Sequence, residues 1–235
     1  MNRVKTGVRG LDKVVDGLPK GRTVLVTGNA GSGKTIFGLQ FANECCTNGL
    51  KTVYMATEED TNDLELQAGS FSWDFKAHEK KDLFKFIELT NQRILEIETA
   101  ASIRIEGKKG GFEGLLEMTP PDTQVLIIDS LGSHTMNLTA REFKDRLDVL
   151  VHNCNKKNVT TMFILDSATS KEYNDLALFS VYGAIVLMKR ENPYTGRRER
   201  VMDVVKMRNT STPIQLLTFD IGHEGIIITT TENGQ

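Results

Sequence analysis

A glycine-rich segment near the N-terminus has the residue types and the spacing that bind nucleotide phosphates. Residues 28–35 read Gly-Asn-Ala-Gly-Ser-Gly-Lys-Thr, which matches the pattern G-x-x-x-x-G-K-[ST]. Its glycines let consecutive N–H groups turn toward one anion, because no Cβ obstructs the backbone. Lys34 can place a positive charge beside the β- and γ-phosphates, and the Thr35 hydroxyl can ligate Mg²⁺. The segment therefore predicts a site for ATP or GTP with Mg²⁺. The residues expected to contact the nucleotide here are Asn29, Ala30, Gly31, Ser32, Gly33, Lys34, Thr35 and Ile36.

The residues on either side predict the strand and the helix that this phosphate loop requires. Residues 23–27 (Thr-Val-Leu-Val-Thr) form a short β-branched run that is typical of a buried strand. Residues 36–46 carry apolar side chains at a spacing that suits a helix packed on a sheet. The N-terminus of that helix would add its positive dipole to the phosphate site. A glycine-rich turn that matches the pattern by chance is the alternative, and the flanking elements argue against it.

An acidic residue at the end of another apolar run could anchor the metal. Residues 125–129 (Val-Leu-Ile-Ile-Asp) read as a central parallel strand buried on both faces. Ligands of such sheets bind at the carboxyl ends of the strands. We therefore expect Asp129 to hold Mg²⁺ through a water molecule, opposite Thr35. An aspartate that only caps a turn is the alternative.

Two adjacent glutamates are the candidates for handling the attacking water. Glu58 and Glu59 follow a strand predicted at residues 51–56, which we expect to lie beside the strand of the phosphate loop. A carboxylate there could accept a hydrogen bond from the water and later its proton. Two neighbouring acids also raise the pKa of one of them. Glu58 is the expected base, and a solvated acidic turn is the alternative.

The elements that must position these residues alternate along the chain as strands and helices. Parallel βα units followed by a β meander indicate an α/β fold: a mostly parallel, doubly wound sheet flanked by helices, with an antiparallel C-terminal extension. We expect residues 1–235 to form one domain, with residues 90–120 undecided and an exposed loop around residues 107–111. Further strands are predicted at residues 83–89, 159–165, 184–189, 201–206, 214–220 and 226–231, and helices at residues 61–70 and 139–155.

The overall composition favours a soluble globular protein without a global charge field. Of 235 residues, 39% are hydrophobic and 26% are charged, and the formal net charge is −2. The near-neutral charge makes nucleic acid an unexpected partner. No apolar run approaches the roughly 18 residues of a membrane span, and the polar start does not resemble a signal peptide. We therefore expect a cytoplasmic protein with no membrane partner.

Several short motifs, in this order along nearly the whole chain, resemble the KaiC family of RecA-type ATPases. Besides the phosphate loop, they are residues 6–12 (Thr-Gly-Val-Arg-Gly-Leu-Asp), 17–21 (Gly-Leu-Pro-Lys-Gly), 57–59 (Thr-Glu-Glu), 70–74 (Ser-Phe-Ser-Trp-Asp), 128–130 (Ile-Asp-Ser) and 205–211 (Val-Lys-Met-Arg-Asn-Thr-Ser). The chain is similar to one KaiC repeat standing alone. Asn209 and Thr212 depart from the family's usual glycine and histidine, which puts base and ribose contacts at these positions in doubt.

The resemblance implies a homo-oligomer, expected to be a hexameric ring with ATP bound between subunits. Glu58 and Glu59 match the family's paired catalytic glutamates. Lys206 and Arg208 match basic residues that reach the phosphate of the neighbouring subunit. Such a cation supplied in trans would stabilise charge on the transferring phosphoryl group; two solvated charges on an edge strand are the alternative. Positions near the base, sugar or phosphate are matched by Ser70, Met207 and Thr210.

The leading hypothesis is an Mg²⁺-dependent ATPase that acts as a switch or signalling protein with an unidentified protein partner. The resemblance also leaves open a Ser/Thr (auto)kinase, because the same site could transfer the γ-phosphoryl group to a hydroxyl. A non-catalytic ATP-sensing scaffold is the third possibility. DNA recombination, by analogy with RecA, is disfavoured by the charge and by the lack of an obvious glycine-rich DNA loop.

Overall fold

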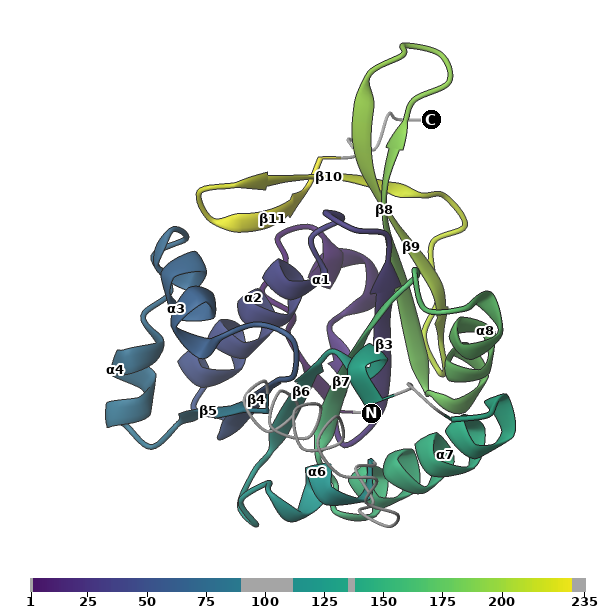
Figure 1. The fold of residues 1–235 in the computed structure, drawn as a ribbon. Coiled ribbons are helices and arrows are strands. Elements are labelled where there is room, and N and C mark those ends of the chain that lie inside the picture. The colour runs from purple at the N-terminus through teal and green to yellow at the C-terminus, as the bar shows by residue number, and fades with distance from the viewer. Residues whose placement is uncertain (1, 90–111, 135–137, 230–235) are drawn as a thin grey trace, which may run out of the picture.

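A computed structural model describes residues 2–89, 112–134 and 138–229 of the chain (Figure 1). One nine-stranded sheet runs through the molecule. Its strands, in spatial order, are β11 (Gly225–Ile228), β10 (Leu217–Gly222), β9 (Arg198–Met207), β8 (Gly183–Glu191), β3 (Thr23–Gly28), β7 (Thr160–Asp166), β6 (Val125–Asp129), β4 (Thr52–Ala56) and β5 (Phe84–Glu88). Two short strands, β1 (Arg3–Val4) and β2 (Leu18–Pro19), form a separate antiparallel pair.

The sheet is parallel from β8 to β5 and antiparallel from β8 to β11. This confirms the predicted α/β class, its parallel centre and its antiparallel C-terminal extension. The hairpin of β10 and β11 lies across one end of the molecule, and the tip of the β8–β9 hairpin projects beyond it (Figure 1).

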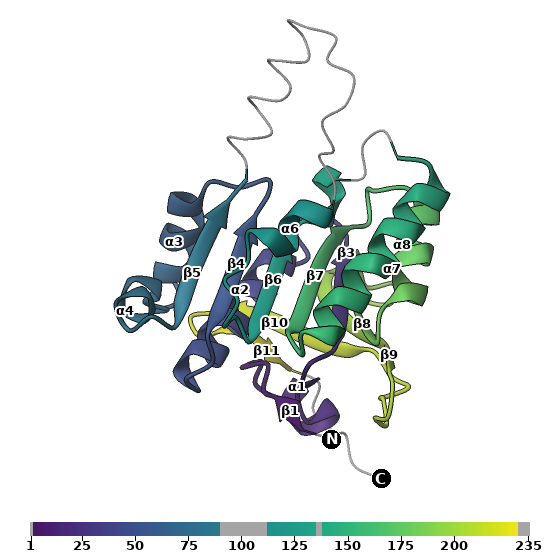
Figure 2. The ribbon, with the colours of Figure 1, turned by 90° about the horizontal axis from the view of Figure 1, so that it is seen from below.

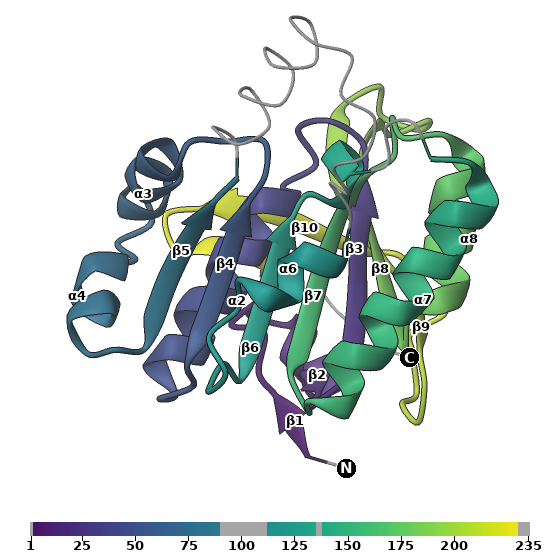
Figure 3. The same ribbon diagram turned by 60° about the horizontal axis from the view of Figure 1, so that its bottom comes forward.

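Helices cover both faces of the sheet because successive strand residues point to opposite sides. Val24 and Val26 belong to one hydrophobic core, whereas Leu25 belongs to the other. The first core includes α1 (Leu11–Val15), α2 (Lys34–Thr47), α3 (Thr61–Gly69) and α4 (Phe75–Lys80); the second includes α6 (Glu113–Glu117), α7 (Ala140–Lys156) and α8 (Lys171–Ser180). Figures 2 and 3 show α6 and α7 on one side of the sheet and α2 on the other.

Most predicted elements are found within a few residues of their expected bounds. The helix predicted at residues 139–155 is α7, which begins after Thr139 in a capping box with Glu142. Helix α8 was not predicted, although Ser170 caps it through a hydrogen bond from the N–H of Tyr173. The loop expected around residues 107–111 lies outside the described residues. Among those described, no helix has both the length and the apolar character needed to cross a membrane.

One expectation about neighbouring strands is wrong. The strand before Glu58 and Glu59 is β4, and it does not lie beside β3. Strands β7 and β6 lie between them, because the chain returns to the centre of the sheet only after β4 and β5 have formed one edge. The neighbours of β3 are β7 and β8.

Candidate active site

The phosphate loop connects β3 directly to α2 and packs against the neighbouring strand β8. Gly31 and Gly33 have positive φ angles of 70° and 103°, a conformation that glycine adopts without steric cost. The side chain of Asn29 donates to the carbonyl oxygen of Lys189 at 2.8 Å and accepts from its N–H at 2.9 Å. A Cβ on Gly28 would lie 1.9 Å from the carbonyl oxygen of Leu187. The loop is therefore braced against β8 rather than free in solvent.

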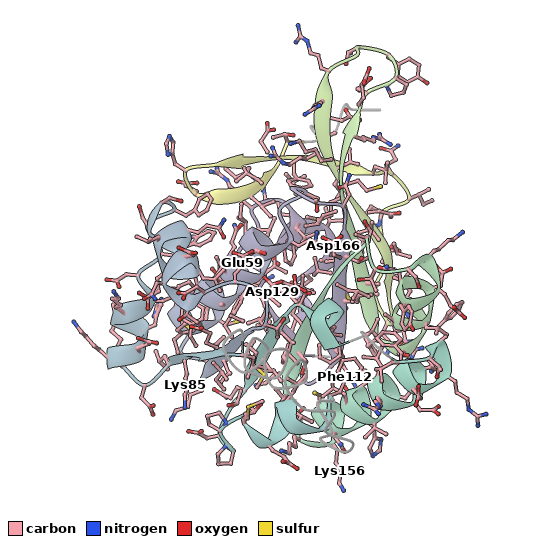
Figure 4. All side chains as sticks on the ribbon, in the orientation of Figure 1. Glu59, Lys85, Phe112, Asp129, Lys156 and Asp166 are labelled. Atoms are coloured by element: carbon pink, nitrogen blue, oxygen red, sulfur yellow. The ribbon has the colours of Figure 1, made fainter. Side chains whose placement is uncertain are left out.

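The loop and the predicted acidic residues line one cavity of about 360 Å³. Three of the lining carboxylates, Glu59, Asp129 and Asp166, lie near one another at the centre of the molecule (Figure 4). The full lining is Ala30, Gly31, Gly33, Lys34, Thr35, Ile36, Glu58, Glu59, Leu64, Gln67, Asp129, Ser130, Asp166, Arg200 and Ile221. The structure thus brings together the predicted loop, both glutamates and the predicted metal ligand.

Asp129 lies at the end of β6, where it is supported by a buried tyrosine of β4. The Tyr54 hydroxyl donates to Asp129 Oδ2 at 2.7 Å. Burial raises the pKa of Asp129, and hydrogen bonds from Tyr54 and Thr35 act in the opposite direction. Asp129 and Thr35 line the same cavity, so both could supply oxygen ligands to one ion there. Sequence reasoning identified both of these candidate ligands but missed Tyr54, whose residue type alone suggests only a core position.

The two glutamates reach the cavity although β4 lies three strands from β3. The Ser130 hydroxyl donates to Glu58 Oε1 at 2.8 Å, and Ser130 is itself fixed by reciprocal hydrogen bonds with Thr57 at 2.7 and 2.8 Å. The pKa of Glu59 is raised by burial and by the negative charges of Asp129 and Glu58. The side chains converge because β4 and β6 end at the same edge of the sheet.

Lys34 forms an ion pair that the sequence did not reveal. Its Nζ lies 2.8 Å from Asp166 Oδ2, at the end of β7. The adjacent Ser167 donates its N–H to the carbonyl oxygen of Gly28. The signal that could have identified Asp166 was its position at the end of a buried strand.

Lys206, Met207 and Arg208 lie away from this cavity, toward the opposite end of the sheet. Met207 pairs with Gly183, which pairs with Val24. The phosphate loop begins at Gly28, four residues further along β3. At about 3.3 Å per residue, this is roughly 13 Å along the strand. Within one chain, these residues are not part of the cavity described above.

Three further predicted contact residues, Ser70, Thr210 and Ser32, do not line the cavity. Ser70 follows α3, and its hydroxyl donates to the carbonyl oxygen of Gln67 at 2.6 Å. The Thr210 hydroxyl accepts a hydrogen bond from the Arg3 guanidinium. Ser32 is fully buried within the phosphate loop. The structure therefore assigns none of these three a place in the cavity lining.

The phosphate loop on a RecA-like parallel sheet defines the class of this protein as a P-loop ATPase. A family model described as "ATPase: KaiC" matches residues 4–233, so the chain belongs to the KaiC family of ATPases. This confirms the resemblance inferred from the motifs.

Relatives and a solved structure agree with this membership. The circadian clock oscillator protein KaiC of Prochlorococcus marinus is 26% identical over 97% of this chain and 46% of its own length. The chain thus spans about half the length of such KaiC relatives. A UPF0273 protein of Thermotoga maritima is 26% identical over 100% of this chain and 99% of its own. The crystal structure of a KaiC-like protein from Pyrococcus horikoshii superposes with a TM-score of 0.75 at 28% identity, covering 97% of this chain and 99% of that one.

Proposed function

We propose that this protein binds ATP with Mg²⁺ and hydrolyses it slowly as a switch. The observation that carries the proposal is the single cavity that contains the phosphate loop, Asp129 and both glutamates. Lys34 stabilises charge on the β- and γ-phosphates once it reaches them. We take residues 1–235 as one ATPase domain that acts in the cytoplasm. The similarity to circadian clock oscillator proteins supports the role of a switch.

The donor set fits magnesium better than a softer metal. Thr35 and Asp129 supply oxygen ligands, which Mg²⁺ prefers, and the ion keeps several waters when few protein groups bind it. Among the described residues, no cluster of three or more histidines, cysteines and acids could hold a metal by itself. When bound, the ion neutralises negative charge on the phosphate oxygens. That neutralisation matters here because four of the lining residues are acidic: Glu58, Glu59, Asp129 and Asp166.

The paired glutamates are suited to orient the water and to accept its proton. Ser130 fixes one oxygen of Glu58, which leaves the other carboxylate oxygen available to a water molecule. The raised pKa of Glu59 brings that group closer to the range of an effective base. We therefore assign catalysis to the pair, with Glu58 as the water-orienting base.

Lys206 and Arg208 complete the site from a neighbouring subunit in a hexameric ring. Their distance along the sheet from the phosphate loop of their own chain supports action in trans. Burial and the positive charge of Arg208 lower the pKa of Lys206, as expected for two neighbouring cations. Ser70, Met207 and Thr210 would then lie near the nucleotide at this interface.

The central test is phosphate release by the Glu58→Gln/Glu59→Gln double variant. We expect turnover to fall by about 10²-fold or more, while ATP binding, measured by calorimetry, changes little. A parallel mass measurement of the protein after incubation with ATP would reveal phosphate transferred to the chain itself. Undiminished hydrolysis in the double variant would refute the assigned role of the glutamates.

A mixing experiment tests the shared site. Arg208→Ala chains keep the glutamates, and the double glutamine variant keeps the basic residues. Neither variant should hydrolyse ATP alone. In a ring that contains equal amounts of both, about a quarter of the sites should regain activity, since each site needs intact glutamates from one subunit and intact Arg208 from the next. No recovery in mixed rings confirmed by native mass measurement would show that the basic residues do not act in trans.

A further inference from the structure

The ammonium group of Lys34 is fully engaged by the protein in this structure. Its Nζ donates to Asp166 Oδ2 at 2.8 Å and to the carbonyl oxygens of Gly28 and Asn29 at 3.0 Å each. An ammonium group has three protons to donate, so these acceptors use all of them. The Lys34 side chain is only 11% exposed. A phosphate can therefore gain Lys34 only by replacing one of these acceptors.

Asp166 is the acceptor most able to compete with phosphate, because it alone carries a full negative charge. Its other carboxylate oxygen accepts the N–H of Ala168 at 2.7 Å. The Asn174 amide, on α8, donates to the carbonyl oxygens of Asp166 and Thr169 at 3.4 and 2.9 Å. Asn174 is in turn fixed by the Thr27 hydroxyl at 2.8 Å. The turn after β7 therefore holds Asp166 Oδ2 toward Lys34.

Strand register accounts for the contact between the two elements. Asp166 is the parallel partner of Gly28, the first residue of the phosphate loop. The N–H of Ser167 donates to the carbonyl oxygen of Gly28 at 2.9 Å. The base of the phosphate loop and the turn after β7 are thus joined by the sheet, and the ion pair follows from this pairing.

We propose that Asp166 is a positioning residue that captures Lys34 and competes with the nucleotide phosphates for it. ATP binding then requires the ammonium to leave a carboxylate that the protein has fixed in place. The proposal rests on the proposed function, since it assumes that this cavity takes ATP. It adds that the chain lowers its own affinity for ATP through this ion pair.

The test is the dissociation constant of ATP–Mg²⁺ for the full chain carrying Asp166→Asn, measured by titration calorimetry. Asparagine keeps the acceptor for the Ala168 N–H but removes the charge that holds Lys34. We expect the affinity to rise about fivefold to tenfold, the range for a charge-assisted pair with one partly exposed member. The matched control is Asp175→Asn, which removes the same charge from an exposed position on α8. It should leave the constant unchanged.

A Lys34→Met background separates capture of the lysine from simple repulsion between Asp166 and the phosphates. Under capture, Asp166→Asn tightens binding only where Lys34 is present. An equal gain in both backgrounds, or weaker binding by Asp166→Asn, would overturn the proposal. If Asp166→Asn does not fold, Asp166→Ser is measured in its place and the same outcomes decide. Failure of the parent chain to bind ATP–Mg²⁺ at all would instead overturn the proposed function.

Discussion

Replacing Tyr54 with phenylalanine tests how the core of the protein supports its candidate metal ligand. Tyr54 is fully buried, and its ring lies 5.6 Å from that of Phe86. Phenylalanine would keep this ring in place and remove only the hydroxyl that donates to Asp129 Oδ2 at 2.7 Å. The substitution therefore removes one hydrogen bond to a buried acid with little change in packing.

The expected loss of stability follows from the charge of the acceptor. A hydrogen bond to a charged group contributes about 1.5–3 kcal/mol. Taking about 2 kcal/mol, and about 2–4 °C per kcal/mol for a chain of this size, the midpoint of thermal unfolding should fall by about 4–8 °C.

The loss should also depend on pH, because Tyr54 helps to keep Asp129 ionised. Burial raises the pKa of Asp129 and the Tyr54 hydrogen bond opposes that rise, so the variant should have a higher pKa still. A carboxyl group whose pKa is raised by folding stabilises the fold below its unfolded value of 3.8. That contribution is lost as the pH increases through the folded value. The destabilisation by Tyr54→Phe should therefore be larger at pH 8 than at pH 4.5.

Chemical denaturation at several pH values provides the assay, with Tyr194→Phe as the matched control. Tyr194 is 95% exposed at the tip of the β8–β9 hairpin, so its hydroxyl should contribute less than about 0.5 kcal/mol. If Tyr54→Phe is as stable as the parent at pH 8, or if its loss is the same at both pH values, the hydroxyl does not support an ionised Asp129.

Two further predictions concern the glutamate pair and the phosphate loop. Because the pKa of Glu59 is raised, kcat/KM for ATP should decline on acidification at a pH above 4.5, the usual pKa of a glutamate. If a Glu59→Gln variant shows the same decline at acidic pH, this assignment is contradicted. Gly28→Ala should prevent folding or soluble expression, because its Cβ would meet the Leu187 carbonyl oxygen at 1.9 Å. Gly69→Ala is the control, because its Cβ would meet nothing within 4 Å; the free energy of unfolding, measured by chemical denaturation, should rise by about 0.5–1 kcal/mol. Equal behaviour of the two variants would refute the steric argument.

Local patterns were sufficient to predict the phosphate loop and most of the elements around it. The spacing of Gly28, Gly33 and Lys34 is a chemical requirement of the loop itself, so it is visible without knowledge of the fold. The strand at residues 125–129 was predicted at its observed bounds because burial on both faces produces a continuous apolar run. Helix α7 was equally clear, since Phe143, Leu147, Leu150 and Val151 recur at helical spacing and form one apolar face, which the structure buries.

The order of the strands could not be predicted in the same way, and the errors at the site follow from it. A βαβ unit constrains the hand of its crossover but not how many strands are later inserted between its two strands. We therefore placed the strand before Glu58 beside β3, whereas β7 and β6 separate them. The contact between Lys34 and Asp166 was missed for the same reason, because it depends on the pairing of β3 with β7 across 132 residues of chain.

Three charged side chains of the cavity already have hydrogen-bond partners within the protein, which affects how ATP would bind. Lys34 is paired with Asp166, Asp129 accepts from Tyr54, and Glu58 accepts from Ser130. Each of these bonds already stabilises the protein before ATP–Mg²⁺ binds. The net binding free energy is therefore the difference between the contacts that the ligand makes and those that it replaces. The bond to Lys34 must break for phosphate to gain the lysine, whereas those to Asp129 and Glu58 can persist because a carboxylate has several acceptor sites. Asp166 should therefore control affinity, while Tyr54 and Ser130 should control the geometry of the metal and the water.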